Sequence, residues 1–289
     1  MGGLSIEERI GRTYAGLSDK LRIAADYVAD HPVEIATRSL RAVATDSGVS
    51  PATLSRLARA LGYDDFAQMR DDGRAAMGRR LIPFSERAQT LRETQTIKTS
   101  QAMLTAHVEA CTANLSYMCR DLDAAKLGSA VEALHRAKTV MLVGSLGSSG
   151  FVDYFGYLAH WFRENWIVAG RNGTILSAAM SRLGPDDAVF VLSKTPHARR
   201  SILALQSAHE RGIPTVFVTD SYASPACAHA DYVFAVPTES PQFFSSYAAT
   251  LVLIEAMVSQ LLARAGSDAE DMIRGAEKQI HGLGETWEP

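Results

Sequence analysis

The chain has 289 residues, of which 47% are hydrophobic and 21% charged, a composition that excludes disorder and has room for about two globular domains. Three cysteines are too few for a disulfide framework and none forms a C-x-x-C pair, so we expect a reducing, cytoplasmic setting without a metal or other cofactor. The formal net charge of −3 argues against nucleic acid as a partner, because binding phosphates calls for a surplus of Lys and Arg.

The charge is unevenly distributed, however. Residues 1–80 carry 12 Lys and Arg against 11 Asp and Glu, a net charge of +1, whereas the remaining residues carry 17 against 21. Within the first part, residues 49–62 contain Arg56 and Arg59 and no acidic residue. A small basic face is therefore expected inside an acidic chain, although a solvated helix with two arginines would give the same pattern.

The first 62 residues have the pattern of packed helices. Apolar residues recur at helical spacing from Ser5 to Pro32, where the run ends. A short helix around Val43 is followed by a turn at 46–48, and Ser50 is then the expected N-cap of a second helix with Pro51 in its first position. This second helix is expected to end at Gly62 and to bury one stripe, which consists of Leu54, Leu57, Ala58 and Leu61.

This order of elements is that of a helix-turn-helix, in which the first residues of the second helix lie nearest the bases of the major groove. Arginine can bind guanine through O6 and N7, and alanine can contact a thymine methyl group. The candidate DNA-contacting residues are the N-cap and those expected to point away from the buried stripe: Ser50, Ala52, Thr53, Ser55, Arg56 and Arg59. Similar helix pairs occur in proteins that never bind DNA, but the acid-free outer face favours a double-stranded DNA partner.

Residues 1–80 are therefore the expected DNA-binding domain, and residues 81–125 are expected to form a helical linker. In residues 126–265, short apolar runs alternate with helical segments, which predicts an α/β domain with a doubly wound, five-stranded parallel sheet. Residues 266–289 are expected to be a C-terminal tail. The expected strands are 139–144, 166–169, 188–193, 215–219 and 232–236, and the expected helices are 150–162, 175–183, 198–211 and 243–262.

Two of the expected strands end in loops rich in hydroxyl groups, at 144–150 and 193–197. Ligands of open parallel sheets bind at the carboxyl ends of strands, and a helix N-terminus after such a loop favours an anion. The glycine spacing fits neither the dinucleotide fingerprint nor a phosphate loop, and the glycines could serve packing alone. The candidate effector-binding residues are Ser145, Ser148, Ser149, Ser193, Lys194, Thr195 and His197, with Glu239, which could instead cap or orient the last helix.

No membrane partner is expected. The first twelve residues mix acidic and basic side chains before any apolar run, unlike a signal peptide. The longest apolar stretch, residues 247–263, is short for a membrane span and contains Glu255 and Gln260, so a buried helix is the better interpretation.

The chain resembles the RpiR/MurR family of bacterial transcription regulators. Residues 44–62 match the family pattern A-x-x-x-x-V-S-x-A-T-h-x-R-h-x-x-x-L-G, and Tyr63-Asp64-Asp65-Phe66 is similar to its continuation. The resemblance implies a helix-turn-helix joined to a sugar isomerase (SIS) domain with a flavodoxin-like sheet. It also implies a regulator of sugar catabolism, repressor or activator, whose SIS domain senses a phosphorylated sugar or a similar small anion.

The SIS loops match the family less closely. The first loop pattern, G-x-G-x-S, corresponds to residues 145–149, which places Ser149 at the phosphate-binding serine and loses one glycine. The second, S-x-S-G-x-T, corresponds to residues 193–198, where Pro196 and Ala198 replace a glycine and a hydroxyl. The basic residues of this segment keep an anionic ligand as the expectation: Lys194, His197, Arg199 and Arg200.

The resemblance leaves regulator and enzyme as alternatives. SIS isomerases often carry a glutamate base where this chain has Arg200, so we expect no catalytic activity; a sugar-phosphate isomerase with an accessory helical domain is the alternative. A protein that keeps the fold without sensing a ligand is a third. Because a helix-turn-helix half-site is short, a homodimer or homotetramer is expected, with the helices at 150–162 and 243–262 as candidate interfaces. Ordinary packing on the sheet explains the apolar character of these helices equally well.

Overall fold

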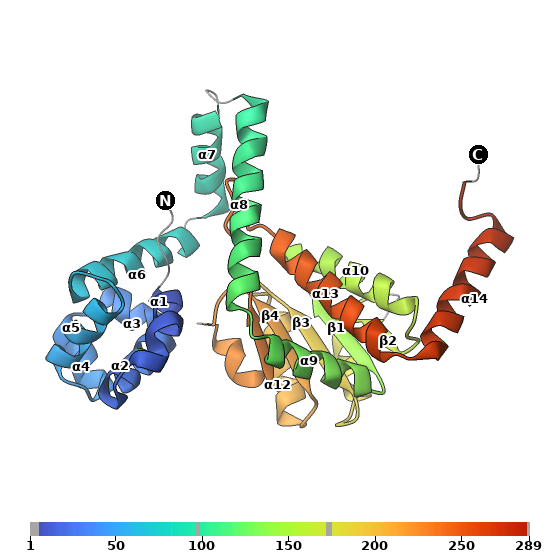
Figure 1. Cartoon of the computed structure of the whole chain (residues 1–289), viewed down its shortest axis with the longest axis horizontal. Coiled ribbons are helices and arrows are strands. Elements are labelled where there is room, and N and C mark those ends of the chain that lie inside the picture. The colour runs from blue at the N-terminus through green and yellow to red at the C-terminus, as the bar shows by residue number, and fades with distance from the viewer. Residues whose placement is uncertain (1–5, 82, 96–98, 172–174, 223, 288–289) are drawn as a thin grey trace. The chain divides into compact units, whose positions relative to one another are not determined.

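The computed structural model describes residues 6–81, 83–95, 99–171, 175–222 and 224–287 (Figure 1). Contacts divide the chain into two compact units, residues 1–90 and 91–289. The first unit has one hydrophobic core, and the second has a core on each face of its sheet.

The first unit is all-helical. Its helices are α1 (Ile6–Thr13), α2 (Asp19–Asp30), α3 (Pro32–Thr37), α4 (Leu40–Ser47), α5 (Pro51–Ala60), α6 (Phe66–Leu81) and α7 (Phe84–Gln95), which extends across the boundary. The core joins residues from α1 to α6, among them the fully buried Ile35, Leu54, Leu57 and Met69. The stripe expected on the second helix is confirmed, since Leu54, Leu57, Ala58 and Leu61 are all buried.

The helical spacing expected up to Pro32 spans two helices, α1 and α2, with a break between them. A single 3-10 turn, η1 (Tyr14–Gly16), follows α1, and α2 starts only after Ser18, whose backbone is extended (φ −68°, ψ 159°). The carbonyl of Ser18 accepts the amides of Leu21 and Arg22 at 2.8 and 2.9 Å, as an N-cap residue does. The apolar spacing hides the break because both helices bury their stripes in the same core.

The second unit is built on a five-stranded parallel sheet with the order β2-β1-β3-β4-β5. Its strands are β1 (Val140–Gly144), β2 (Trp166–Val168), β3 (Ala188–Leu192), β4 (Thr215–Thr219) and β5 (Tyr232–Ala235). The expected doubly wound sheet is confirmed, with strand ends within a residue of the expected positions. The chain order reverses between β1 and β3, and the register pairs Gly144 with Leu192, so the loops leaving these strands start side by side.

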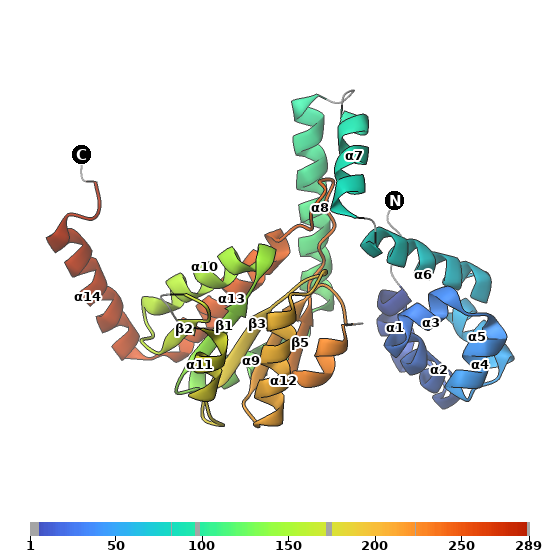
Figure 2. The same ribbon diagram turned by 180° about the vertical axis from the view of Figure 1, so that it is seen from behind.

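Helices cover both faces of the sheet (Figure 1, Figure 2). One face packs on α9 (Ala124–Arg136), α10 (Ser149–His160) and α13 (Ala248–Arg264), and the other on α11 (Leu176–Ser181) and α12 (Arg199–Glu210). Along β1, Val140 and Leu142 enter the first core, while Met141 and Val143 enter the second. Strands buried on both faces explain the unbroken apolar runs in the sequence.

The structure adds detail to three of the expected segments. The last core helix, α13, starts at Ala248 rather than at 243, because residues 237–247 form an irregular connection after β5. The 22-residue helix α8 (Ser100–Asp121), in the segment expected to be a linker, buries Asn114 and Met118 within the second unit. The segment expected to be a tail contains a helix, α14 (Ser267–Leu283).

None of the described helices is long and apolar enough to cross a membrane alone. α13 and α14 together pass by length and composition, but they are bent by 113° where they meet.

Candidate functional site

The turn between α4 and α5 is formed by local hydrogen bonds and backbone geometry. Gly48, after the last residue of α4, has φ +68°, a left-handed conformation in which glycine carries no steric penalty. Ser50 then caps α5, since its hydroxyl accepts the amide of Thr53 at 3.2 Å. Pro51 occupies the first helical position and Gly62 ends the helix with φ +83°. The expected cap, turn and stop are confirmed.

The outer face of α5 is exposed and basic. Ala52, Arg56 and Arg59 are exposed, and Ser55 is half-buried. α5 carries no acidic residue, so the two arginines keep an uncompensated charge along this helix. Sequence reasoning did not single out Arg41, which is exposed in the first turn of α4. In helix-turn-helix proteins the first helix crosses the DNA backbone, so the place of Arg41 on this helix was the available signal.

Thr53 does not face outward, and that expectation is wrong. Its side chain is 5% exposed, and its Oγ1 lies 2.9 Å from the hydroxyl of Ser50. At the third position of α5 the threonine folds back over the cap, so both hydroxyls stabilise the helix start. Thr53 also lies one helical turn before the buried Leu57, so it borders the buried stripe rather than the outer face.

The second candidate site lies where β1 and β3 end. The loop after β1 contains the 3-10 turn η2 (Leu146–Ser148), and α10 begins at Ser149. A Cβ on Gly147 would lie 2.9 Å from the ring of Phe244, so this glycine permits the close approach of the segment before α13. Ser148 is buried and pairs through its hydroxyl with that of Tyr247 at 3.0 Å, whereas Ser149 contacts the carbonyl of Leu146 at 2.9 Å. Ser145 is half-buried, and its carbonyl accepts the amide of Ser148.

The loop after β3 brings its hydroxyls to the same sheet edge. The buried hydroxyl of Ser193 lies 3.3 Å from Nδ1 of His197, within the same loop. Thr195 donates its amide and its hydroxyl to the carboxylate of Asp220, which follows β4, at 3.1 and 3.2 Å. Asp220 therefore fixes this loop. The rule that pointed to β1 and β3 could have found Asp220 too, because it also follows a parallel strand.

Lys194 is buried between this loop and the start of α13. Its side chain is 4% exposed, its Nζ donates to the carbonyl of Ser246 at 3.4 Å, and the ammonium lies 4.4 Å from the ring centre of Tyr247. Burial lowers the pKa of Lys194 to about 7, and the nearby charge of Asp220 opposes that shift only in part. Burial also raises the pKa of Tyr247, whose ring stacks on Phe151 at 4.3 Å.

Two further side chains singled out from the sequence, those of Glu239 and Arg200, are exposed. Glu239 is exposed, and the contact that places it is made by its backbone carbonyl, which accepts Nδ2 of the buried Asn114 at 2.8 Å. Arg200 is exposed at the start of α12, and its guanidinium packs against Gly170, where a Cβ would lie 3.0 Å from Nη2.

The loops after β1 and β3 therefore bring hydrogen-bond donors to one edge of the sheet, beside the carboxylate of Asp220, an acceptor that follows β4. These donors are hydroxyls, the N-terminus of α10 and one buried amine. Among the described residues, no group of three His, Cys, Asp or Glu side chains could hold a metal ion.

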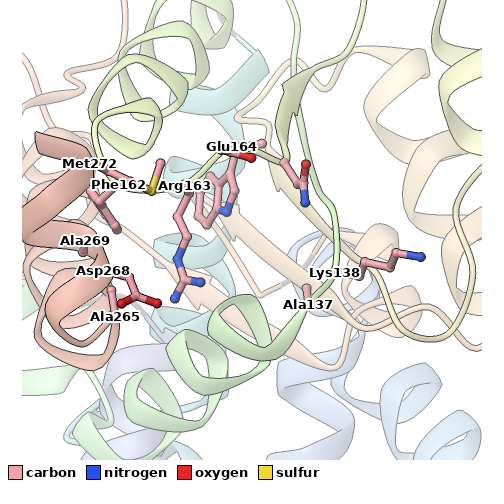
Figure 3. Close-up of a pocket in the computed structure, with 11 residues that line it drawn as sticks. Ala137, Lys138, Phe162, Arg163, Glu164, Ala265, Asp268, Ala269 and Met272 are labelled. Carbon is pink, nitrogen blue, oxygen red and sulfur yellow. The ribbon is translucent and has the colours of Figure 1, made fainter. Parts of the chain in front are cut away.

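A separate cavity of about 280 Å³ lies at the opposite, amino-terminal edge of the sheet (Figure 3). Its walls include Phe162 and Arg163 before β2, Trp166 at the start of β2, and residues of the first turns of α14. Arg163 pairs with His135 through one guanidinium nitrogen, and burial lowers the pKa of both groups. This cavity is distinct from the loops of the second candidate site.

Two family models match this chain, one in each of its parts. The model of the rpiR-family helix-turn-helix domain matches residues 4–72, and the SIS domain model matches residues 133–260. The chain belongs to the RpiR family of transcriptional regulators. An HTH-type transcriptional regulator of Haemophilus influenzae is 23% identical over 231 residues, which cover 79% of this chain and 78% of that protein.

Two solved structures share the fold of this RpiR-family chain. The sugar isomerase domain of an RpiR transcription factor from Sphaerobacter thermophilus is 24% identical, with a TM-score of 0.58 over 61% of this chain and 98% of that one. The Vibrio vulnificus NanR protein, complexed with ManNAc-6P, is 21% identical, with a TM-score of 0.57 over 96% of this chain and 99% of that one.

Proposed function

We propose that this RpiR-family regulator binds operator DNA through α5 and is controlled by a small anionic sugar derivative, a sugar phosphate or a chemically similar anion, bound between the loops after β1 and β3. The observation that carries the proposal is the pairing, in one chain, of a capped and acid-free α5 with a strand-end site rich in hydroxyls. The NanR relative, complexed with ManNAc-6P, supports a phosphorylated sugar as the ligand class.

At the DNA, Arg56 and Arg59 are the proposed contacts to base edges or phosphates, and Ala52 and Ser55 supply small contacts near the helix start. Ser50 holds α5 in place, because its hydroxyl is already engaged by Thr53. The exposed Arg41 is a further proposed phosphate contact from α4. This small basic face supports weak binding per subunit, so we propose that a homodimer or homotetramer reads a symmetric operator.

At the effector, we propose that Ser148, Ser149, Ser193 and Thr195 surround the anion, with Lys194 as its cation. Ser145 and His197 complete the two loops. We place Glu239 at the rim of the site, because its side chain is exposed and its described hydrogen bond is made by its backbone carbonyl.

We propose a regulator rather than an isomerase. Asp220 follows β4, but its carboxylate accepts three donors, from Thr195 and Thr219, which hold the loop. Arg200 is a cation and cannot act as the base at neutral pH.

The DNA arm of the proposal is tested by Arg56→Ala with Arg274→Ala as the matched control. Arg274 is an exposed arginine on α14, so its loss changes the net charge equally. We expect Arg56→Ala to weaken binding to DNA selected from the upstream regions of the host genome by about tenfold or more, because a good side-chain to base contact contributes about 1–3 kcal/mol. Equal binding by Arg56→Ala and Arg274→Ala, with both variants folded by circular dichroism, would contradict α5 as the reading helix.

The effector arm is tested by a thermal-shift screen of sugar phosphates and sugar acids, followed by DNA release with each stabilising compound. Ser149→Ala should lose the response, whereas Ser129→Ala should keep it. Ser129 is a matched control because its hydroxyl makes a similar bond, to the carbonyl of Ala125 at 3.0 Å on α9. Conversion of a sugar phosphate by the wild type, followed by NMR, would instead show an isomerase.

A further inference from the structure

Lys194 presents a buried amine without a carboxylate partner. In the part of the chain that the structure describes, no Asp or Glu oxygen lies within 4.0 Å of its ammonium. The oxygens of Asp220 accept Thr195 and Thr219 instead. A lysine that is 4% exposed thus faces one carbonyl, of Ser246, and the ring of Tyr247. A buried charge of this kind is costly unless a counter-ion completes it.

The ammonium form of Lys194 also has N–H groups without a described acceptor. An ammonium has three N–H groups, and the carbonyl of Ser246 accepts one of them. In sequence the lysine stands between Ser193 and Thr195, two residues of the proposed anion site. Tyr247, under the ammonium, is bonded to Ser148 of the other loop. The amine is therefore placed where both loops meet.

We propose that Lys194 is the counter-ion of the bound anion and that binding is consequently linked to protonation of this lysine, so that the regulator takes up a proton with its effector. This inference rests on the proposed effector site. Without the anion, burial favours the neutral amine near neutral pH; with the anion beside it, the ammonium is the stable form. Affinity should accordingly fall as the pH rises above about 7, because the anion must then pay for protonation of the lysine.

Among the described residues, four other titratable groups face Lys194, its neighbours in the loop or Ser246. They are Asp220 after β4, Tyr247 at the start of α13, His197 bonded to Ser193, and Cys111 on α8, whose sulfur lies 3.8 Å from the hydroxyl of Ser246. A Lys194→Met variant keeps all four and removes only the amine. Any dependence on pH that survives in that variant therefore belongs to another group.

The experiment uses inorganic sulfate as the probe, because sulfate keeps the same charge throughout the pH range. Sulfate affinity is measured from thermal shifts of the full-length protein at pH 7.5 and 8.5, with ionic strength held constant by chloride. The wild type should lose roughly eightfold in affinity between the two pH values, as expected for a required proton on a group with a pKa of about 7. Lys194→Met should bind about tenfold more weakly at pH 7.5 and show no dependence on pH. Lys138→Met, which removes an exposed lysine, should behave as the wild type.

A second measurement needs no variant. Saturating sulfate added to unbuffered wild type at pH 8, with a pH indicator, should take up close to one proton per chain. Equal affinity at both pH values, no proton uptake, or a slope retained by Lys194→Met would each overturn the role of Lys194 and leave the effector site in place. If neither sulfate nor any sugar phosphate stabilises the wild type at either pH, the proposed effector site itself fails.

Discussion

The two proposed binding regions are assembled in opposite ways. In the helix-turn-helix, Gly48, Ser50 and Thr53 form the turn and cap within six residues. In the effector site, Ser148 pairs with Tyr247 across 99 residues of sequence, and Lys194 reaches Ser246 across 52. The start of α5 is therefore held by local geometry, whereas the proposed effector site depends on segments that only the folded sheet brings together. Changes in distant segments should consequently disturb the effector site more readily than the cap of α5.

The largest expected effect comes from the core of the first unit. Leu57→Ala removes a fully buried side chain under α5, so it should lower the free energy of unfolding of the first unit by about 2–5 kcal/mol. All three tryptophans lie beyond residue 90, at 161, 166 and 287. In urea, the part of the circular dichroism change that comes from the first unit should therefore move to a lower urea concentration. The tryptophan fluorescence transition, which reports on the second unit, should stay unchanged.

The prediction assumes that the two units unfold independently. A tryptophan transition that moves as far as the circular dichroism transition would show that the core under α5 also stabilises the second unit. The matched change in the second unit is Leu205→Ala, another fully buried leucine, on α12. Leu205→Ala should shift the tryptophan fluorescence transition. The part of the circular dichroism change that comes from the first unit should stay where it is in the wild type.

The next effect is the dependence of the second unit on pH. The pKa of Lys194 is about 7 in the folded protein and about 10.4 for an ordinary lysine in the unfolded chain. Between these values the unfolded chain holds a proton that the folded chain lacks, so stability rises with pH by at most about 1.4 kcal/mol per unit. Below pH 7 both states are protonated, and this contribution no longer changes. The free energy of unfolding of wild type and Lys194→Met is measured in urea by tryptophan fluorescence from pH 7 to 9. Lys194→Met should be the more stable protein at pH 7, and its advantage should shrink as the pH rises. A constant difference would contradict the lowered pKa of Lys194.

The same contrast explains how far the sequence could predict the molecule. The strands and the cap of α5 follow from patterns within a few residues, and the meeting of the loops after β1 and β3 follows from the topology of parallel sheets. The partnership of Ser148 with Tyr247 could not be predicted, because 243–262 has a helical pattern throughout although α13 starts at Ala248. Phe244, within that segment, packs on Gly147 instead of continuing a helix. Thr53 lies one turn before the buried Leu57, at the edge of the stripe, and its hydrogen bond to Ser50 holds it there, so it does not face outward as expected.

A smaller effect is expected at the turn before α5. Gly48→Ala should destabilise the first unit by about 1–2 kcal/mol, because the left-handed backbone at φ +68° penalises a side chain. A Cβ there would meet nothing within 4 Å, so the cost is conformational and not a clash. Gly48→Asn should therefore cost less than Gly48→Ala, since asparagine tolerates this conformation, and circular dichroism in urea would rank them. The opposite ranking would mean that the space around Gly48, and not its backbone, is limiting.

The smallest effect that separates the two regions is Tyr247→Phe. It removes the hydroxyl that pairs with Ser148 but keeps the ring that stacks on Phe151 and lies under Lys194. The lost hydrogen bond should lower the free energy of unfolding of the second unit by about 1 kcal/mol, and it should also weaken effector binding, because Ser148 then loses the partner that fixes it. DNA affinity in the absence of effector should stay unchanged, since the cap of α5 is formed within its own unit. Tyr232→Phe, a change of the same chemistry on β5, is the control, and effector affinity lowered equally by both variants would show that Ser148 does not need Tyr247 to present its hydroxyl.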